Sequence, residues 1–293
     1  MSGAFPFADL ALSRRLERAE GLSCARFVEA RARIFPDRGA TWIEVAGARA
    51  MFDGVSSPLT QTFGLGLFQP TAAADLDAIE AFYAERGAPV FHEVSPLADA
   101  GLPALLASRG YQPFEFSSVM YQPIDTAGLK PCATPAGEAG TTPTGEVVQA
   151  FRPAGVTVRL IEKDEAEIYA RVSAEGWAEF GVGDFLREIG RVSGSVQGLH
   201  LFLADLDGAP IAAGALNVAD GVALFAGAST IPSGRTRGAQ LALLARRLRF
   251  AAEQQCDVAM MVALPGSSSQ RNAERNGFRI AYTRIKWRLK LEP

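Results

Sequence analysis

Two Asp-Gly pairs constrain the fold of this chain more than any other feature. Asp207-Gly208 and Asp220-Gly221 separate three apolar runs in the second half of the sequence. Because both central residues of a type I′ turn need positive φ, an Asp-Gly pair between strand-like runs favours a two-residue hairpin. The sequence therefore predicts an antiparallel meander of three strands, at residues 199–206, 209–218 and 222–228.

Helical and extended patterns flank this meander. A short strand around residues 156–161 and an amphipathic helix from about Asp164 precede it, and a helix at 238–254 follows it. We expect that last helix to bury one apolar face, formed by Leu241, Leu244, Ala245, Leu248 and Ala252. The final segments predict a buried strand in DVAMMVAL, a short helix in SSQRNAER and a strand in RIAYTRIKWRLKL. This order indicates an α/β domain in which a helix crosses over between strands.

The first half of the chain repeats this order more faintly. TAAADLDAIEAFYAERG corresponds to the long helix, APVFHEVSP to the buried strand, LPALLASRGY to the short helix and FSSVMYQPI to the final strand. Arg109-Gly110-Tyr111 corresponds to Asn276-Gly277-Phe278. This self-similarity predicts a duplication. The alternative is that any two α/β halves look alike at this coarse level.

A segment poor in large apolar residues separates the two halves. Residues 126–154 are rich in Pro, Gly, Thr and Ala, which is the composition of a linker. We therefore expect one domain at residues 1–125 and a second at 155–293. The expected fold class is α/β (α+β), with a mixed, mostly antiparallel sheet flanked by helices in each domain.

Charge and cysteine content exclude several classes of protein. The 293 residues carry a formal net charge of −3 and are 48% hydrophobic, so we expect a globular protein with no nucleic-acid or membrane partner. The three cysteines are odd in number and far apart, which argues against a disulfide framework and a zinc site. No signal-peptide or membrane-spanning run occurs. These features indicate a cytoplasmic protein without a metal.

Residues 233–238 (SGRTRG), here named the arginine loop, precede the long helix that follows the meander. At a helix N-terminus the first N–H groups lack intrahelical partners and the macrodipole is positive, so anions bind there. Gly234 and Gly238 allow close approach of a ligand, while Arg235 and Arg237 add charge. The segment therefore predicts a pyrophosphate site, although it matches neither the P-loop nor the dinucleotide fingerprint. Three further arginines are expected to form a solvated face or to contact another phosphate: Arg246, Arg247 and Arg249.

The meander, the arginine loop and the Gly-Phe segment at 269–278 together resemble the GNAT family of acyl-CoA-dependent N-acyltransferases. The resemblance covers residues 156–291 and, more weakly, 34–124. In that family a loop of pattern Arg/Gln-x-x-Gly-x-Gly/Ala cradles the CoA pyrophosphate, and residues 235–240 fit this pattern except at Gln240. The preceding strand is implied to hydrogen-bond the pantetheine arm. The residues implied to bind acetyl-CoA, or another acyl-CoA, are Ala226, Ala228, Thr230, Arg235, Thr236, Arg237, Gly238, Ala239, Gln240, Ser269 and Asn272.

The catalytic residues depart from the family pattern. Many members carry a tyrosine that protonates the leaving CoA thiolate where this chain has Ala273, and an asparagine where it has Gly266. Tyr282 is the nearest replacement acid, and its alternative reading is a half-buried strand tyrosine. Carboxylates that act through water are the candidate bases: Glu175, Glu179 and Asp184. Trp177 and Phe180 are implied to line the acceptor pocket, with plain surface or packing roles as the alternative for each of these residues.

These features together lead us to interpret the chain as a tandem GNAT N-acetyltransferase with a degenerate N-terminal half. The counterpart of the arginine loop, FQPTAAADLD, has no arginine or glycine and carries Asp75 and Asp77, which would repel a pyrophosphate. The expected reaction transfers acetyl from acetyl-CoA to an amine of a small molecule or peptide. The acceptor's identity and the choice between monomer and homodimer stay open. The alternatives are a non-catalytic acyl-CoA-binding sensor and an α/β module without a ligand.

Overall fold

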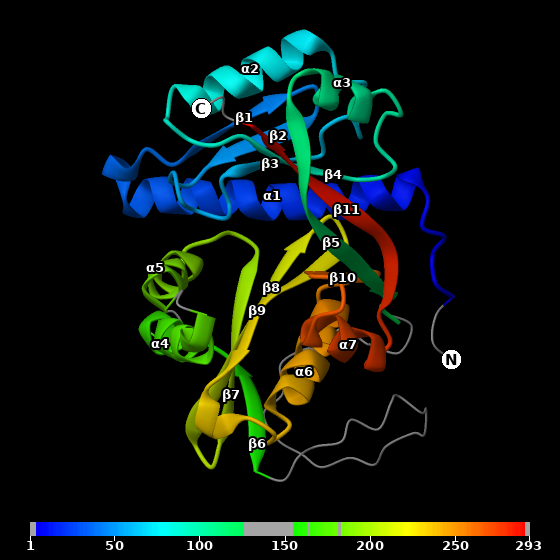
Figure 1. Ribbon diagram of the computed structural model, residues 1–293. Coiled ribbons are helices and arrows are strands. Elements are labelled where there is room, and N and C mark those ends of the chain that lie inside the picture. The colour runs from blue at the N-terminus through cyan, green and yellow to red at the C-terminus, as the bar shows by residue number, and fades with distance from the viewer. Residues whose placement is uncertain (1–3, 126–154, 163–164, 181–182, 291–293) are drawn as a thin grey trace. The chain divides into compact units, whose positions relative to one another are not determined.

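The computed structural model describes residues 4–125, 155–162, 165–180 and 183–290 (Figure 1). The predicted linker at 126–154 and Cys132 lie outside these residues. The chain divides into two compact units. Unit 1 comprises Met1–Phe5, Pro123–Arg191 and His200–Ala259, and unit 2 comprises Pro6–Gln122, Val192–Leu199 and Met260–Pro293.

The predicted meander forms the sheet of unit 1. The meander consists of β7 (Leu199–Leu206), β8 (Ala209–Ala219) and β9 (Val222–Thr230). The separately predicted strand β6 (Val156–Leu160) joins the same sheet beside β7. They follow one another in the sheet, and β6 and β7 as well as β8 and β9 are antiparallel. Asp207 and Gly208 take φ values of +51° and +83°, and Asp220 and Gly221 take +50° and +74°. The structure therefore confirms both predicted Asp-Gly turns.

Helices cover both faces of the unit 1 sheet. They are α4 (Ala166–Gly176), α5 (Gly183–Ser193) and α6 (Ala239–Glu253), with short 3₁₀ turns at Ala178–Phe180 and Pro232–Gly234. Ser229 donates a hydrogen bond to Ser173 of α4, whereas its neighbour Thr230 accepts one from Gln240 of α6. Because successive strand residues point to opposite faces, α4 and α6 lie on opposite sides of β9, as Figure 1 shows. The sequence predicted one helix before the meander, and the structure has α4 and α5 there.

Unit 2 contains a mixed sheet in the order β1-β2-β3-β4-β11-β5. The strands β3 and β4 are parallel, and the other neighbouring pairs are antiparallel. Their bounds are β1 (Thr41–Val45), β2 (Ala48–Phe52), β3 (Gln61–Phe63), β4 (Phe91–Val94), β5 (Tyr111–Pro123) and β11 (Arg279–Leu289). The strand β10 (Val258–Ala263) begins in unit 1 and ends in unit 2. A mixed, mostly antiparallel sheet flanked by helices is the predicted fold class.

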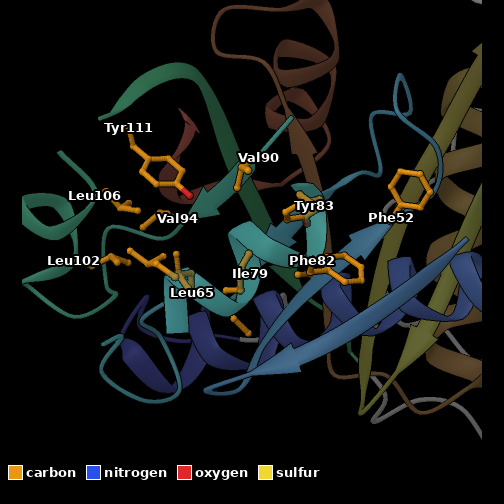
Figure 2. Close-up of a cluster of buried hydrophobic side chains, with 13 residues drawn as sticks. Phe52, Leu65, Ile79, Phe82, Tyr83, Val90, Val94, Leu102, Leu106 and Tyr111 are labelled. Carbon is orange, nitrogen blue, oxygen red and sulfur yellow. The ribbon is translucent and has the colours of Figure 1, made fainter. Parts of the chain in front are cut away.

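The helices of unit 2 also lie on two faces of its sheet (Figure 1). They are α1 (Leu10–Ile34), α2 (Ala73–Ala84), α3 (Leu102–Ser108) and α7 (Ser268–Arg275), with a 3₁₀ turn at Pro36–Arg38. Along β2, Met51 packs with buried residues of α1, whereas Ala50 and Phe52 pack with those of α2 and α3. Figure 2 shows this second cluster. Its buried members are Ala48, Ala50, Phe52, Leu65, Leu76, Ile79, Phe82, Tyr83, Val90, Val94, Leu102, Leu106 and Tyr111.

The compact units differ in their limits from the two predicted domains. Residues 155–293 were expected to form one domain, but β11 lies between β4 and β5, so Met260–Pro293 groups with the first half. Pairing between strands that are distant in the sequence leaves no local pattern, which is why the sequence did not reveal it. The repeat itself is visible in the element order. Gly110, between α3 and β5, and Gly277, between α7 and β11, both take positive φ, of +85° and +92°.

Candidate functional site

The arginine loop of unit 1 is fixed at its start by close packing on β8. Ile231 donates a main-chain hydrogen bond to Ile211, and Gly234 donates one back to Ile231. A Cβ atom at Gly234 would lie 2.7 Å from Ile211 Cβ, so only glycine fits without displacement. The loop therefore leaves β9 along a defined path.

The end of the loop presents main-chain N–H groups at the start of α6. Gly238 is the N-cap residue with φ +78°, and none of the described side chains caps the first turn. Thr236 also takes a left-handed conformation, with φ +63°, which costs a non-glycine residue on the order of 1 kcal/mol or more. Arg235, Thr236 and Arg237 are exposed. An uncapped helix N-terminus beside two exposed guanidinium groups is suited to bind a phosphate.

Arg235 is partly neutralised by a carboxylate of unit 1. Its Nη1 and Nη2 atoms each lie 3.0 Å from an oxygen of Glu179, so the pair is bidentate. Both side chains are about half exposed, and such surface pairs contribute little to stability. Glu179, one of the predicted bases, is thus placed beside the predicted phosphate site. A bound phosphate would compete with Glu179 for the Arg235 guanidinium.

Gln240, the departure from the family pattern, has a local partner. Its Nε2 atom donates a 2.8 Å hydrogen bond to Thr230 Oγ1 at the end of β9. This bond joins the second residue of α6 to the strand that precedes the arginine loop. The Gln240 side chain therefore links the start of α6 to the end of β9, on either side of the arginine loop.

A bulge interrupts β9 where the pantetheine arm was predicted to bind. The register passes from Ala213 opposite Ser229 to Ala215 opposite Ala226, so one extra residue lies on β9. Gly227, in the bulge, takes φ +59°. The first four residues of β9 are buried, but Ala226 and Gly227 are exposed and Ala228 is half-buried. Main chain exposed within a strand can hydrogen-bond an extended ligand.

The three arginines further along α6 differ from one another. Arg249 is exposed, which fits a solvated face, whereas Arg246 is partly buried over the rings of Phe202 and Phe250 and pairs with Glu253. Arg247 contradicts both parts of the prediction, because it is 3% exposed and, among the described residues, donates hydrogen bonds only to main-chain carbonyl groups. The predicted apolar face of α6 is also only partly right. Leu244 and Ala252 are buried as expected, but the other buried residues are Ala239, Leu243, Arg247, Phe250 and Ala251.

A buried tyrosine that the sequence reasoning missed lies next to the bulge. Tyr169 of α4 is 3% exposed, and a Cβ atom built on Gly227 would lie 3.5 Å from its hydroxyl oxygen. Burial raises the pKa of Tyr169 to about 12, and the positive charge of Arg247 opposes this rise. Tyr169 fits the apolar periodicity of α4, so the sequence alone does not distinguish it from an ordinary core residue.

The other predicted residues of unit 1 are placed more loosely. Glu175 is exposed near the end of α4. Trp177 is half-buried and caps α4, with its main-chain N–H donating to Ala174. The side chains of Phe180 and Asp184 lie outside the described residues. Of these residues predicted to face the acceptor, the structure places the side chains of Glu175 and Trp177.

Three predicted residues belong to unit 2. Ser269 and Asn272 are exposed on α7, whose N-terminus is capped by Ser267. Ala273, which stands where a tyrosine was expected, is 1% exposed. A large side chain at this buried position would not fit without repacking the core. Tyr282 is 8% exposed in β11.

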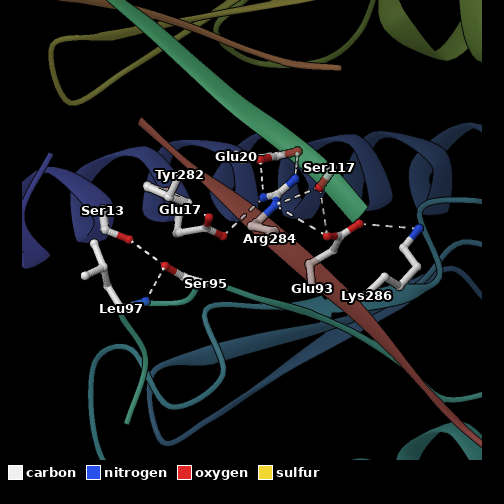
Figure 3. A network of polar contacts seen from close by, with 10 residues as sticks. All are labelled: Ser13, Glu17, Glu20, Glu93, Ser95, Leu97, Ser117, Tyr282, Arg284 and Lys286. Atoms are coloured by element: carbon white, nitrogen blue, oxygen red, sulfur yellow. Dashed lines mark hydrogen bonds and ion pairs between the residues drawn. The ribbon is translucent and has the colours of Figure 1, made fainter. Parts of the chain in front are cut away.

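Tyr282 is part of a buried polar network (Figure 3). Its hydroxyl donates a 2.9 Å hydrogen bond to Glu17, and Arg284 contacts Glu17, Glu20 and Glu93. Burial and the nearby carboxylate of Glu17 raise the pKa of Tyr282 well above its usual value. Burial also raises the pKa of Glu17 to about 7, although Arg284 opposes the rise. Tyr282 keeps its proton in this setting, and its predicted catalytic role stays a prediction.

The counterpart of the arginine loop in the first half is closed to anions. The helix α2 begins without arginine or glycine, and Asp75 accepts a 2.8 Å hydrogen bond from the main-chain N–H of Ala72. A carboxylate thus already occupies the N-terminus of α2. Asp77 pairs with Arg109. This arrangement agrees with the predicted loss of the cofactor site in the first half.

The described residues contain neither a membrane-spanning helix nor a metal-binding cluster. None of the helices in this part of the chain combines the length and apolar character of a membrane span. No group of His, Cys, Asp and Glu side chains in the same part of the chain could hold a metal ion. Cys256 is buried, and burial raises the pKa of its thiol to about 11.

Comparisons with known proteins give matches among solved structures. No protein-family model and no curated protein matches the chain. A GCN5-related N-acetyltransferase from Kribbella flavida matches with a TM-score of 0.57 and 18% identity, over 92% of this chain and 96% of that chain. A tandem GNAT protein from the clavulanic acid biosynthesis pathway matches with a TM-score of 0.54 and 12% identity, over 84% and 79% of the two chains. A second GCN5-related N-acetyltransferase, from Sphaerobacter thermophilus, gives 0.50 and 16%, over 80% and 72%.

Proposed function

We propose, on the premise that this chain has the fold of the GCN5-related N-acetyltransferases, that it transfers an acyl group from a CoA thioester to an amine. The observation that carries this proposal is the uncapped N-terminus of α6, where the arginine loop presents Arg235 and Arg237 beside free main-chain N–H groups. Acetyl-CoA is the donor that we propose first. The acceptor is an amine of a small molecule or peptide.

The cofactor would be held along β9 and the arginine loop. The pyrophosphate would accept hydrogen bonds from the N–H groups that follow Gly238 and ion pairs from Arg235 and Arg237. The pantetheine arm, an extended chain with amide groups, would lie along Ala226–Ala228, where the first two residues are exposed. A bound CoA thioester supplies an activated acyl group with a thiolate as its leaving group.

The chemistry asks little of the protein beyond positioning. The amine nitrogen attacks the thioester carbonyl, while a base removes its proton and a main-chain N–H stabilises the oxyanion. Glu175 is the proposed base, acting through water, with Glu179 released from Arg235 as the second candidate. Trp177 and Phe180 are proposed to contact the acceptor.

A second candidate function is a sensor that binds acyl-CoA without turnover. The buried Ala273, where related enzymes are expected to carry an acid, favours this alternative. Both functions require the same cofactor site. They differ in whether acetyl leaves the cofactor.

Product formation separates the two functions. The purified protein would be incubated with acetyl-CoA and pools of polyamines, aminoglycosides and peptides, with CoA release followed by a thiol reagent and products identified by mass spectrometry. Gly238→Asp places a carboxylate at the N-terminus of α6 and should abolish both binding and turnover. Gly87→Asp is the matched control, because Gly87 also takes positive φ, of +61°, at an exposed position outside the proposed site.

Each outcome decides between the candidates. An acetylated amine from wild-type and Gly87→Asp protein, absent with Gly238→Asp, supports the transferase. Acetyl-CoA binding with no product from any pool supports the sensor. Binding that Gly238→Asp leaves unchanged would overturn the proposed cofactor site.

A further inference from the structure

The side chain of Tyr169, which is 3% exposed, places a hydroxyl group beside the bulge of β9. It extends from α4 toward Gly227, where the hydroxyl oxygen would lie 3.5 Å from a Cβ atom if the glycine carried one. No hydrogen bond joins this hydroxyl to any other residue in the described part of the chain. A buried phenol normally finds a hydrogen-bond partner. Tyr169 is therefore positioned to donate to a ligand at the bulge.

The opposite face of the bulge carries a buried positive charge. Arg247 Nη1 donates to the carbonyl oxygens of Ala215 at 2.9 Å and Ala226 at 3.4 Å, and its guanidinium carbon lies 5.0 Å from the centre of the Phe225 ring. Within the described residues, no carboxylate pairs with Arg247. Burial lowers the pKa of Arg247 to about 10, so it remains a cation at neutral pH. A buried cation without a carboxylate is costly, which points to a negative charge that forms nearby during function.

We propose that Tyr169 is the proton donor to the departing CoA thiolate and that Arg247 is a positioning residue that favours this transfer; the proposal rests on the proposed acyltransferase function. Tyr169 and Arg247 both act at the bulge of β9, on Gly227 and Ala226. The resemblance to the GNAT family implies that the thioester is held along this same segment. Tyr169 thus supplies the hydroxyl that Ala273 lacks.

The proposed step moves the acyl group from sulfur to nitrogen. The amine nitrogen forms a bond to the thioester carbon, and the C–S bond breaks with its electron pair remaining on sulfur. The Tyr169 hydroxyl proton moves to that sulfur, so that neutral CoA thiol leaves. The proton removed from the attacking amine by the base returns through solvent to the tyrosinate, which Arg247 stabilises in the meantime. No oxidant, reductant or metal takes part.

A binding experiment tests this step without knowledge of the acceptor. The affinities of CoA and of desulfo-CoA, which lacks the thiol, would be measured by calorimetry between pH 7 and 9.5. A hydrogen bond from Tyr169, strengthened by the charge of Arg247, should make wild-type protein prefer CoA by about tenfold or more as the thiol ionises. Arg247 is the charged group that acts on Tyr169 from the elements packed against it.

Variants separate a chemical role from a structural one. Tyr169→Phe keeps the ring and should bind desulfo-CoA as wild type does, while its preference for CoA falls to within twofold. Tyr83→Phe removes another buried hydroxyl, in unit 2, and should leave the preference unchanged. Arg247→Met should lower the preference as well, and if it fails to fold, Tyr169→Phe alone decides.

The outcomes distinguish this inference from the proposed function. If neither compound binds to wild-type protein, the proposed function itself fails. If both bind but wild-type protein shows no preference for CoA at any pH, the role of Tyr169 is wrong and the cofactor site stands. A preference that survives Tyr169→Phe also overturns the inference.

Discussion

The hydroxyl group of Tyr282 donates a hydrogen bond to Glu17 Oε1 over 2.9 Å, which joins two residues 265 positions apart in the chain. Glu17 lies on α1 and Tyr282 on β11, so the first helix of the chain and its last strand meet inside unit 2. Arg284, two residues further along β11, contacts Glu17, Glu20 and Glu93 (Figure 3). The fold of unit 2 therefore depends on polar groups from both ends of the sequence.

Removing the Tyr282 hydroxyl should destabilise the protein. Tyr282→Phe leaves the buried carboxylate of Glu17 with one donor fewer, so the free energy of unfolding should fall by about 1–3 kcal/mol. Urea denaturation measures this change. Tyr121→Phe is the matched control, because its hydroxyl donates to an uncharged carbonyl oxygen of Pro6 and its loss should be smaller. Equal losses for the two variants would argue against a special role of the Glu17 contact.

Glu17 should make stability fall as the pH rises. The pKa of Glu17 is about 7 in the folded protein and 4.5 in the unfolded chain. Between these two pH values the folded state therefore binds more protons than the unfolded state does. The contribution of Glu17 to stability is therefore present below about pH 4.5 and is lost as the pH rises through 7. Glu17→Gln cannot ionise and should remove this loss.

The comparison uses the free energy of unfolding in urea at pH 5 and pH 8. Wild-type protein should lose more stability over this interval than Glu17→Gln does. Glu253→Gln, at an exposed surface pair of α6, should behave like wild type. The same pH dependence in wild type and Glu17→Gln would show that Glu17 is already ionised at pH 5.

Close helix packing in unit 1 should make Gly190 intolerant of a side chain. A Cβ atom at this position of α5 would lie 2.5 Å from Ala170 Cα of α4, so Gly190→Ala should destabilise by about 1–3 kcal/mol. Gly21 of α1 is the control, because its Cβ would meet Phe63 Cβ at an ordinary 3.6 Å. Gly21→Ala should leave the melting temperature unchanged or raise it slightly. Equal melting temperatures for both variants would contradict the packing of α4 on α5.

The local signals in the sequence predicted most of the elements correctly. Asp207-Gly208 and Asp220-Gly221 specify their own backbone, since few other pairs accept two successive positive φ values. The long helix α1 was missed because its buried face includes Ser13, Glu17 and Arg31, which break the apolar periodicity. Each of these polar residues has a partner that is distant in the sequence: Ser13 hydrogen-bonds with Ser95, and Arg31 pairs with Asp53. Glu17 contacts Tyr282 and Arg284 of β11, which begins 245 positions after the end of α1 by the numbering of Ile34 and Arg279.

The candidate site divides in the same way. The arginine loop was recognisable because glycines and arginines before a helix act through local geometry and charge. The burial of Arg247 could not be predicted, since it depends on carbonyl oxygens of Ala215 and Ala226 in two different strands. Tyr169 likewise gains its position only when α4 packs on the bulge of β9. Local chemistry is readable from sequence, and contacts across elements are not.

One chain should bind one CoA. The N-terminus of α2 is occupied by the carboxylate of Asp75, whereas that of α6 has no side-chain cap. Calorimetric titration should therefore give a stoichiometry of one CoA per chain. Asp75→Ala removes that carboxylate but adds no positive charge, so the stoichiometry should stay at one. Two CoA molecules per wild-type chain would contradict the assignment of the first half as a degenerate repeat.

The affinity for CoA of the Arg235→Ala/Arg237→Ala double variant tests the central claim most directly. Isothermal titration should show that wild-type protein binds CoA and that the double variant binds about tenfold more weakly or worse, since it loses two charge-assisted contacts to the pyrophosphate. With added salt, the affinity of wild-type protein for CoA should also fall more steeply than that of the double variant. Arg171→Ala/Arg187→Ala removes two exposed arginines from α4 and α5 and should bind as wild type does. Equal affinities for the two double variants, or no binding of CoA to wild-type protein, would contradict the account.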